Sequence, residues 1–329
     1  MKNKLASLAL ALACAFLLQP ISPLLAQGPL TPPGAPAPTM KTLDQVEART
    51  PLAGGTSPLS IGSGSYYLTG NLNISSTSAN GITVSASDVT LDLNGFTLSG
   101  PGSGSGAGIY LNGGVTNVTV VNGTIRGWGS HGINALGNPD LRVEKLRVIS
   151  NGGVGIAGDV NCVAIYCVAK SNVGQGIQGT DNCLIKDCQV AGTLGSPGDG
   201  ISLGNGAVVS GCTTSNNGGN GITATTDSVI RDCSARNNSG RGIFGGVVEH
   251  CTALENSLPG ITALTATSCY GSSTGSSVTG TGIGANIATN CYGTSTNGTG
   301  LNAILAIGSY GFSTFGPAVV YSNHYNMPP

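Results

Sequence analysis

Charged residues are scarce in this sequence of 329 residues, and the few that are present do not cluster. They make up 8% of the chain, and the 13 basic and 14 acidic residues leave a net charge of −1. A surface for nucleic acid or for an anionic membrane would need a concentration of Lys and Arg. The composition therefore argues against nucleic acid as a partner.

Sequence that favours helices is also lacking, because the chain holds 54 glycines. A glycine in a helix interior costs roughly 1 kcal/mol relative to alanine. This composition does not suit an ordinary mixed α/β enzyme. It indicates an all-β chain.

The N-terminus has the layout of a secretory signal peptide. Lys2 and Lys4 precede an apolar run from Leu5 to Leu18, and small residues end at Ala26. The run is too short for a membrane span, so we expect none in the mature chain. We predict a secreted, periplasmic or cell-surface protein cleaved near Ala26. Cleavage before Cys14 would instead give a lipid-anchored protein, but it would leave an apolar segment on the mature chain.

An internal repeat is the strongest signal in the sequence. A Gly-Ile or Gly-Leu step recurs every 18 to 24 residues, at Gly108, Gly132, Gly155, Gly176, Gly200, Gly221, Gly242, Gly260, Gly282 and Gly300. A cysteine follows the step by 12 or 9 residues in seven units, at Cys167, Cys188, Cys212, Cys233, Cys251, Cys269 and Cys291, and Ser309 takes this place in the last unit. Five residues further on stands a small polar residue, at Asn172, Thr193, Asn217, Asn238, Asn256, Thr274, Thr296 and Thr314.

Units of this length, made of short β-rich runs between Gly, Asn and Ser, cannot bury an apolar face alone. Stacked on one another they share a core, which predicts a single-stranded parallel β-helix, or solenoid, of roughly ten or eleven coils between Gly81 and Ser309. Equivalent residues would then lie about 4.8 Å apart. We therefore predict inner columns of Ile and Cys, and an Asn column whose amides pair with the coils above and below.

Nine cysteines remain once the signal peptide is removed, and an odd number leaves at least one thiol unpaired. The spacing of Cys162 and Cys167 with Cys183 and Cys188 would also suit a four-thiolate metal site. The repeat favours a structural interpretation, in which stacked buried cysteines behave as small apolar residues. We accordingly predict no metal site and no cofactor.

Two stretches carry a resemblance to known proteins: SDVTLDLNGFTLSG at residues 87–100 and NGTIRG at residues 122–127. They resemble the opening coils of right-handed parallel β-helix proteins of the pectin-lyase-like superfamily, especially its uncharacterised bacterial secreted members. The resemblance covers the chain from about residue 65 to its end and implies the fold, whereas one such scaffold hosts many functions.

The resemblance and the composition together divide the chain. We expect a signal peptide at 1–26, a Pro-rich linker with a short N-terminal cap at 27–64, the β-helix at 65–316 and a C-terminal tail at 317–329. Within the cap, residues 42–45 (TLDQ) indicate the start of a short helix.

A candidate catalytic patch lies next to the cysteine column. Asp232 and His250 directly precede cysteines of adjacent units, and Arg231 and Glu249 come one position earlier. An acid, an imidazole and a guanidinium one coil apart could transfer a proton while Arg231 holds a sugar carboxylate. The alternative is a solvated, salt-bridged patch, which we favour.

Enzymes of the resembling superfamily do not strengthen this candidate. Its pectate lyases use several acidic residues for calcium and an Arg base, and its polygalacturonases use Asp motifs with Gly-His-Gly and Arg-x-Lys. This chain offers only loose echoes, GSHG at 129–132 and PGDG at 197–200. Inherited lyase or hydrolase chemistry is therefore in doubt.

Three tyrosines in the last units form a second candidate site. Tyr270, Tyr292 and Tyr310 each follow the cysteine position, which predicts a ladder of outward rings. Such rings could stack on sugar faces and offer their hydroxyls. Alternatively, the tail with Val319 and Val320 folds over the ladder and buries it.

Three functions remain open. The chain is best explained as an exported, non-catalytic rod that is a polysaccharide-contacting or surface protein, with unknown oligomeric state. The first alternative is a polysaccharide lyase, hydrolase or epimerase acting on an acidic glycan. The second is a purely structural or adhesin-like repeat. Exposure of the three tyrosines would favour the first over the third.

Overall fold

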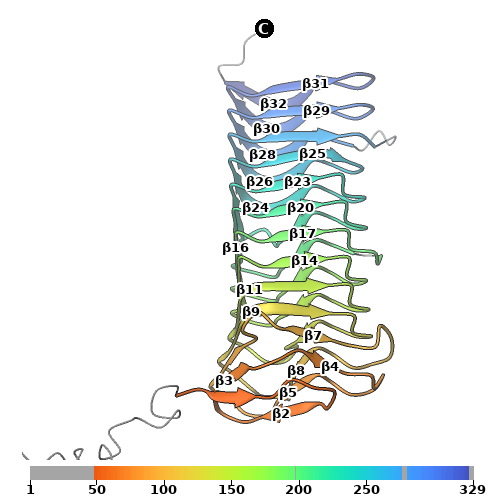
Figure 1. Ribbon diagram of the computed structural model, residues 1–329. Coiled ribbons are helices and arrows are strands. Elements are labelled where there is room, and N and C mark those ends of the chain that lie inside the picture. Colours follow the sequence, from red (N-terminus) through yellow and green to blue (C-terminus); the bar gives the residue numbers. More distant parts are fainter. Residues whose placement is uncertain (1–47, 197, 276–279, 326–329) are drawn as a thin grey trace, which may run out of the picture. The chain divides into compact units, whose positions relative to one another are not determined.

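The computed structural model describes residues 48–196, 198–275 and 280–325, which form a stack of parallel β-strands (Figure 1). The predicted signal peptide at 1–26 and the predicted helix at 42–45 lie outside the described residues. Within the described part of the chain, no helix is long and apolar enough to cross a membrane.

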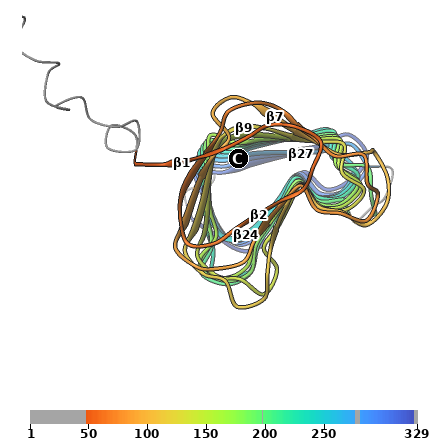
Figure 2. The same ribbon diagram turned by 60° about the horizontal axis from the view of Figure 1, so that its bottom comes forward.

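Three ladders of parallel strands, here ladders A, B and C, form the walls of the stack, and each turn of the chain passes through A, B and C in order. Figure 2 looks obliquely down the stack and shows successive turns lying over one another. The stack comprises about 12 turns of the chain, and each turn contributes one extended segment to each ladder. The predicted all-β solenoid is thus confirmed, including the ten or eleven coils expected between Gly81 and Ser309.

Most strands belong to one ladder. Ladder A contains β2 (Leu59–Ile61), β5 (Ile82–Val84), β8 (Ile109–Leu111), β10 (Ile133–Asn134), β12 (Ile156–Ala157), β15 (Ile177–Gln178), β18 (Ile201–Ser202) and β21 (Ile222–Thr223). Ladder B contains β3 (Gly64–Leu68), β6 (Val89–Asp92), β13 (Val163–Ile165), β16 (Leu184–Lys186), β19 (Val208–Ser210) and β22 (Val229–Arg231), and β1 (Thr50–Leu52) pairs with β3. Ladder C contains β4 (Leu72–Asn73), β7 (Thr97–Ser99), β14 (Val168–Lys170), β17 (Gln189–Ala191), β20 (Thr213–Ser215), β23 (Ser234–Arg236), β25 (Thr252–Asn256), β27 (Tyr270–Ser273), β29 (Tyr292–Ser295) and β31 (Tyr310–Ser313).

Longer strands run through two ladders. Ladders B and C share β9 (Val118–Arg126) and β11 (Leu141–Ile149). Ladders A and B share β24 (Ile243–Glu249), β26 (Ile261–Thr267), β28 (Ile283–Thr289), β30 (Leu301–Ile307) and β32 (Val319–Tyr325). The turn between A and B is therefore reduced to a bend from β24 onward, which shortens the coils at the C-terminal end.

A single residue in the left-handed conformation bends the chain between ladders B and C. Tyr166, Asp232 and His250 occupy this corner with φ of 54°, 55° and 50°, and each directly precedes a column cysteine. The corner residue is exposed and the next residue is buried. The bend thus explains why polar side chains alternate here with cysteines.

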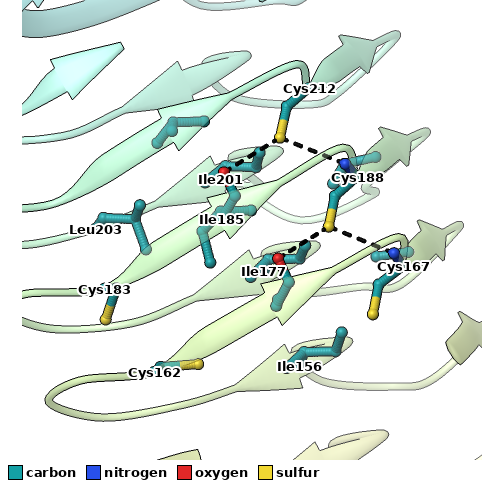
Figure 3. Close-up of a cluster of buried hydrophobic side chains, with 14 of the residues drawn as sticks. Ile156, Cys162, Cys167, Ile177, Cys183, Ile185, Cys188, Ile201, Leu203 and Cys212 are labelled. Carbon is teal, nitrogen blue, oxygen red and sulfur yellow. Dashed lines mark hydrogen bonds between the residues drawn. The ribbon is translucent and has the colours of Figure 1, made fainter. Parts of the chain in front are cut away.

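The seven column cysteines are buried inside this bend, and they are free thiols. Figure 3 shows three of them, Cys167, Cys188 and Cys212, one above another. The Cys188 thiol donates to the carbonyl oxygen of Ala164, at 3.4 Å, and its Sγ accepts the N–H of Cys167, also at 3.4 Å. The adjacent Cys167 and Cys212 thiols, together with burial, raise the pKa of the Cys188 thiol. Buried, hydrogen-bonded cysteine side chains of this kind fill the core as small groups.

A buried ladder of asparagine amides follows the strands of ladder C. The Nδ2 atoms of Asn151, Asn217 and Asn238 donate to the Oδ1 of the next residue in the column, each at 2.9 Å. Thr193 stands in the same column and donates its backbone N–H to Asn217 Oδ1. Because these groups are excluded from water, each amide needs a hydrogen-bond partner, and the Nδ2 atoms of Asn172 and Asn256 find theirs in the backbone carbonyls of Val148 and Ala235.

Beyond Asn256 the polar column differs from the prediction. The register shifts between Ala253 and Asn256, so Asn256 pairs with Ser273 rather than with Thr274. Ser273 is buried and Thr274 is exposed, and Ser295 and Ser313 continue the column in place of the predicted Thr296 and Thr314. A constant count of five residues could not show this irregularity in the strand.

The strands extend past both predicted limits of the β-helix. β1 and β2 lie within the segment 27–64 that was expected to be linker and cap. β32 lies within the expected tail and pairs with β30 from Leu301↔Val319 to Ile307↔Tyr325. These segments lack the column Cys and Asn of the repeat. Their extended backbone nevertheless forms the parallel strand pairs that a further coil needs.

Candidate functional site

The three predicted sugar-binding tyrosines form one column on the outer face of ladder C. Tyr270 is the register partner of Tyr292, and Tyr292 is the register partner of Tyr310. The exposed fraction is 45% for Tyr292 and 53% for Tyr310, and Tyr270 is half-buried. The next residue in each strand is glycine, on the inner side of the wall. Alternation along the strand therefore turns the rings outward.

Two of these rings stack on each other. The Tyr270 and Tyr292 ring centroids are 5.2 Å apart, with 21° between the planes. Each ring covers one face of the other, so a sugar ring has no access between them. The tyrosine column offers a ligand its ring edges, its hydroxyls and the ring faces outside the stacked pair. This contact surface is smaller than that of three separate rings.

The described part of the C-terminal tail, up to residue 325, does not fold over these rings, contrary to the alternative. Val319 and Val320 belong to β32, which continues ladder A and pairs with Leu301 and Asn302. The tyrosines lie on ladder C, a different wall. Phe312, on β31 beside Tyr310, is also exposed and widens the aromatic surface.

The structure also brings the four predicted acid–base residues into one patch on the outer wall. Arg231 and Glu249 are register partners at the ends of β22 and β24. Asp232 and His250 occupy the next corner, with 3.9 Å between His250 Nδ1 and Asp232 Oδ1. Both side chains are nearly two-thirds exposed, which leaves them in contact with solvent. Water screens such a pair and is not excluded from any reaction there.

Two hollows in the described surface are notable, and neither includes a residue of the acid–base patch. A hollow of about 390 Å³ lies beside Arg126 and Ile149, near the end of β9. A larger hollow of about 450 Å³ lies over β26, β28 and β30, around Gly284. The repeat pattern did not predict either hollow. The sequence feature that could have indicated the larger one is Gly284, which occupies an outward position that Thr262 and Asn302 fill in the adjoining coils.

Among the described residues, no group of three or more His, Cys, Asp or Glu side chains could hold a metal ion. Cys162, Cys167, Cys183 and Cys188 are each buried as free thiols in the wall. Their spacing reflects the coil repeat, because Cys167 and Cys188 flank register partners of β14 and β17.

Comparison with known proteins bears on the fold. Residues 59–194 match the family described as the right handed beta helix region. A search of curated protein sequences found no match to the chain.

Solved structures with a similar course of the chain include two modules from Azotobacter vinelandii. The A-module of mannuronan C-5 epimerase AlgE4 aligns with 13% identity and a TM-score of 0.54, over 85% of this chain and 87% of the module. The A-module of epimerase AlgE6 aligns with 14% identity and a TM-score of 0.53, over 85% and 89%. Likeness at these identities concerns the fold alone, and with the ladders described above and the family match it means that the chain folds as a right-handed parallel β-helix.

Proposed function

We propose that this chain is an exported, non-catalytic rod that contacts polysaccharide through Tyr270, Tyr292 and Tyr310. The observation that carries the proposal is the exposure of an in-register aromatic column on a rigid wall. Tyrosine pairs an apolar ring with a hydroxyl, which suits the mixed surface of a sugar. A purely architectural column would be expected to bury its rings.

The fold of the comparison modules is compatible with this role. By name, both modules belong to enzymes that act on mannuronan, a polysaccharide. A parallel β-helix can therefore present a wall to a long glycan, and repeats about 4.8 Å apart approach the length of a sugar unit. This comparison supports a glycan as the partner class and gives no information about the tyrosines.

Binding of the mature protein to a polysaccharide array, with acidic and neutral members, tests the proposal. Tyr292→Ala removes the central ring and should weaken retention at least tenfold. Tyr292→Phe keeps the ring and removes the hydroxyl, so it separates apolar contact from hydrogen bonding. The matched control is Tyr166→Ala, since Tyr166 is also exposed but stands alone at a corner of another coil.

Two results would contradict the proposal. Retention that is unchanged in Tyr292→Ala would exclude the ladder as the contact surface. Absence of retention on every glycan would leave the structural or adhesin-like role as the better explanation.

The approach of His250 to Asp232 supports a second candidate, a lyase, hydrolase or epimerase acting on an acidic glycan. In that function, His250 or Asp232 would act as base, Arg231 would hold the sugar carboxylate, and Glu249 would complete the patch. The test is release of unsaturated or reducing ends from the same array. Product that disappears in His250→Ala, with Tyr292→Ala unaffected, would establish the enzyme and overturn the non-catalytic role.

A further inference from the structure

The C-terminal coils differ chemically from the rest of the rod. After Glu255 the sequence contains no Asp, Glu, Lys or Arg. The walls there are built from Ser, Thr, Asn, Gly and Ala, with exposed apolar side chains among them. Any ligand held by these coils must be recognised without an ionic contact.

Within this uncharged section lies the larger hollow, on the outer face of ladder A and on a different wall from the tyrosines. Its centre is Gly284 of β28, between Thr262 of β26 and Asn302 of β30 in one column, with Val320 of β32 beyond them. A Cβ atom placed on Gly284 would have no atom within 4 Å. The hollow therefore exists because one side chain is missing from an otherwise continuous column.

The lining combines two kinds of surface. Asn286 and Asn302 contribute amides and Thr262 a hydroxyl, whereas Ile304 and Val320 are exposed aliphatic side chains. An amide can donate and accept at once, and so can a hydroxyl. The floor consists of Ala263, Ala285 and Ala303, which are register partners and leave depth for a ring.

We propose that this hollow binds one residue of a neutral sugar, independently of the tyrosine ladder. A pyranose has an apolar C–H face, which suits Ile304 and Val320, and a rim of hydroxyls, which suits Asn286 and Asn302. A volume of about 450 Å³ lies in the range of small-molecule sites. A uronate would find no Lys or Arg in this lining to compensate for the lost hydration of its carboxylate.

The experiment is an NMR titration of the full mature chain, which follows the side-chain amide signals of Asn286 and Asn302. The probes are cellohexaose, mannohexaose and maltohexaose, with hexagalacturonate as the acidic comparison. At least one neutral hexasaccharide should shift both signals, and hexagalacturonate should not. No shift with any neutral probe, or a stronger response to hexagalacturonate, would overturn the proposal.

Gly284→Val fills the hollow without disturbing the fold. The position faces outward in a strand, where a β-branched residue is favoured, and no left-handed φ is required. Affinity for the neutral probe should fall at least tenfold. Ser202→Val is the matched control, because Ser202 holds the equivalent outward position in β18, coils away from the hollow.

Further variants separate this site from its alternatives. Asn286→Ala removes one amide without filling the hollow and should also weaken binding. Tyr292→Ala should leave the Asn286 and Asn302 shifts unchanged, and their loss in that variant would overturn an independent site. Shifts that depend on protein concentration without sugar would identify a second copy of the chain as the occupant, which would also overturn the proposal.

Discussion

The coils from β12 to β23 and those from β24 to β32 belong to one stack of strands, but different side-chain hydrogen bonds stabilise the two groups. In the first group, ladders A and B are joined by a turn, where Asp159 accepts hydrogen bonds from the Gly137 N–H and the Thr180 hydroxyl. In the second group, one strand spans both ladders and no Asp or Glu stands at the bend between them, although Glu249 and Glu255 lie elsewhere in these coils. The stack therefore tolerates a change in coil length together with the loss of the carboxylate at this bend.

The inner columns differ in the same way. Asparagine amides join several neighbouring coils directly: Asn151 bonds to Asn172, Asn217 to Asn238 and Asn238 to Asn256, and the Thr193 N–H donates to Asn217 Oδ1. Ser295 instead donates to Gly280 O of the adjoining coil and accepts the Gly298 N–H of its own turn. The first arrangement joins side chain to side chain, and the second joins a single hydroxyl to the backbone of the adjoining coil. We expect the C-terminal coils to open first.

Among the variants that test this difference, Asn217→Ala should lower the free energy of unfolding most. Asn217 donates to Asn238 Oδ1 at 2.9 Å and accepts the Thr193 N–H at 3.2 Å. Its loss leaves buried partners unpaired, at about 1–3 kcal/mol each, so the free energy of unfolding should fall by about 3 kcal/mol. Urea unfolding measures the change. Thr213→Ala, on the outer face of β20, is the control, and an equal loss in both variants would refute the coupling role of the amides.

Ser295→Ala should have a smaller and more local effect. The variant loses the hydroxyl donor to Gly280 O, at 2.6 Å, and the acceptor of the Gly298 N–H, at 2.9 Å. We expect about 2 kcal/mol less protection in hydrogen exchange of the C-terminal strands, and no change in β14 or β17. Faster exchange throughout the rod would show that serine couples coils as asparagine does.

The fold was predictable from the sequence because the repeat is a local pattern that stacking copies. The Gly-Ile step and the Cys position recur with the coil, so ladders A and C follow from counting residues. The places where counting failed are irregularities: the shift between Ala253 and Asn256, and the terminal strands β2 and β32, which lie outside the run of column Cys and Asn residues. Backbone pairing alone maintains the stack there.

The candidate sites were predictable in part. Register placed the tyrosines together, and it placed Asp232 beside His250, because column neighbours are set by the repeat. Ring stacking between Tyr270 and Tyr292 was missed, since it depends on side-chain torsions. The hollow at Gly284 was missed because an absent side chain has meaning only beside the side chains that surround it.

One pH effect on stability is expected at His131, in the coil that precedes the first group. His131 Nδ1 accepts the Val154 N–H at 2.9 Å, and burial lowers the pKa of His131. The unfolded chain then binds a proton at a higher pH than the folded chain, so this contribution is complete above about 6.5 and is lost as pH falls below it. We expect a loss of about 1 kcal/mol, the worth of one hydrogen bond. Val154 amide exchange should accelerate at low pH, and an equal change in β28 would contradict this origin.

The smallest expected effect on stability comes from the stacked rings of Tyr270 and Tyr292, which join two of the C-terminal coils through their side chains. A double-mutant cycle with Tyr270→Ala and Tyr292→Ala should give a coupling of about 0.5–1.5 kcal/mol, because the rings lie 5.2 Å apart at 21°. Thr252→Ala with Tyr292→Ala is the control cycle, since Thr252 and Tyr292 lie two coils apart in the same column and are separated by Tyr270. Equal coupling in both cycles would mean that the stack adds nothing to the stability of the wall. In that case any loss of glycan binding in Tyr292→Ala would be attributable to the lost contact with the glycan. If the coupling is positive, the binding of Tyr292→Ala and of the unmodified protein must be compared at equal fraction folded.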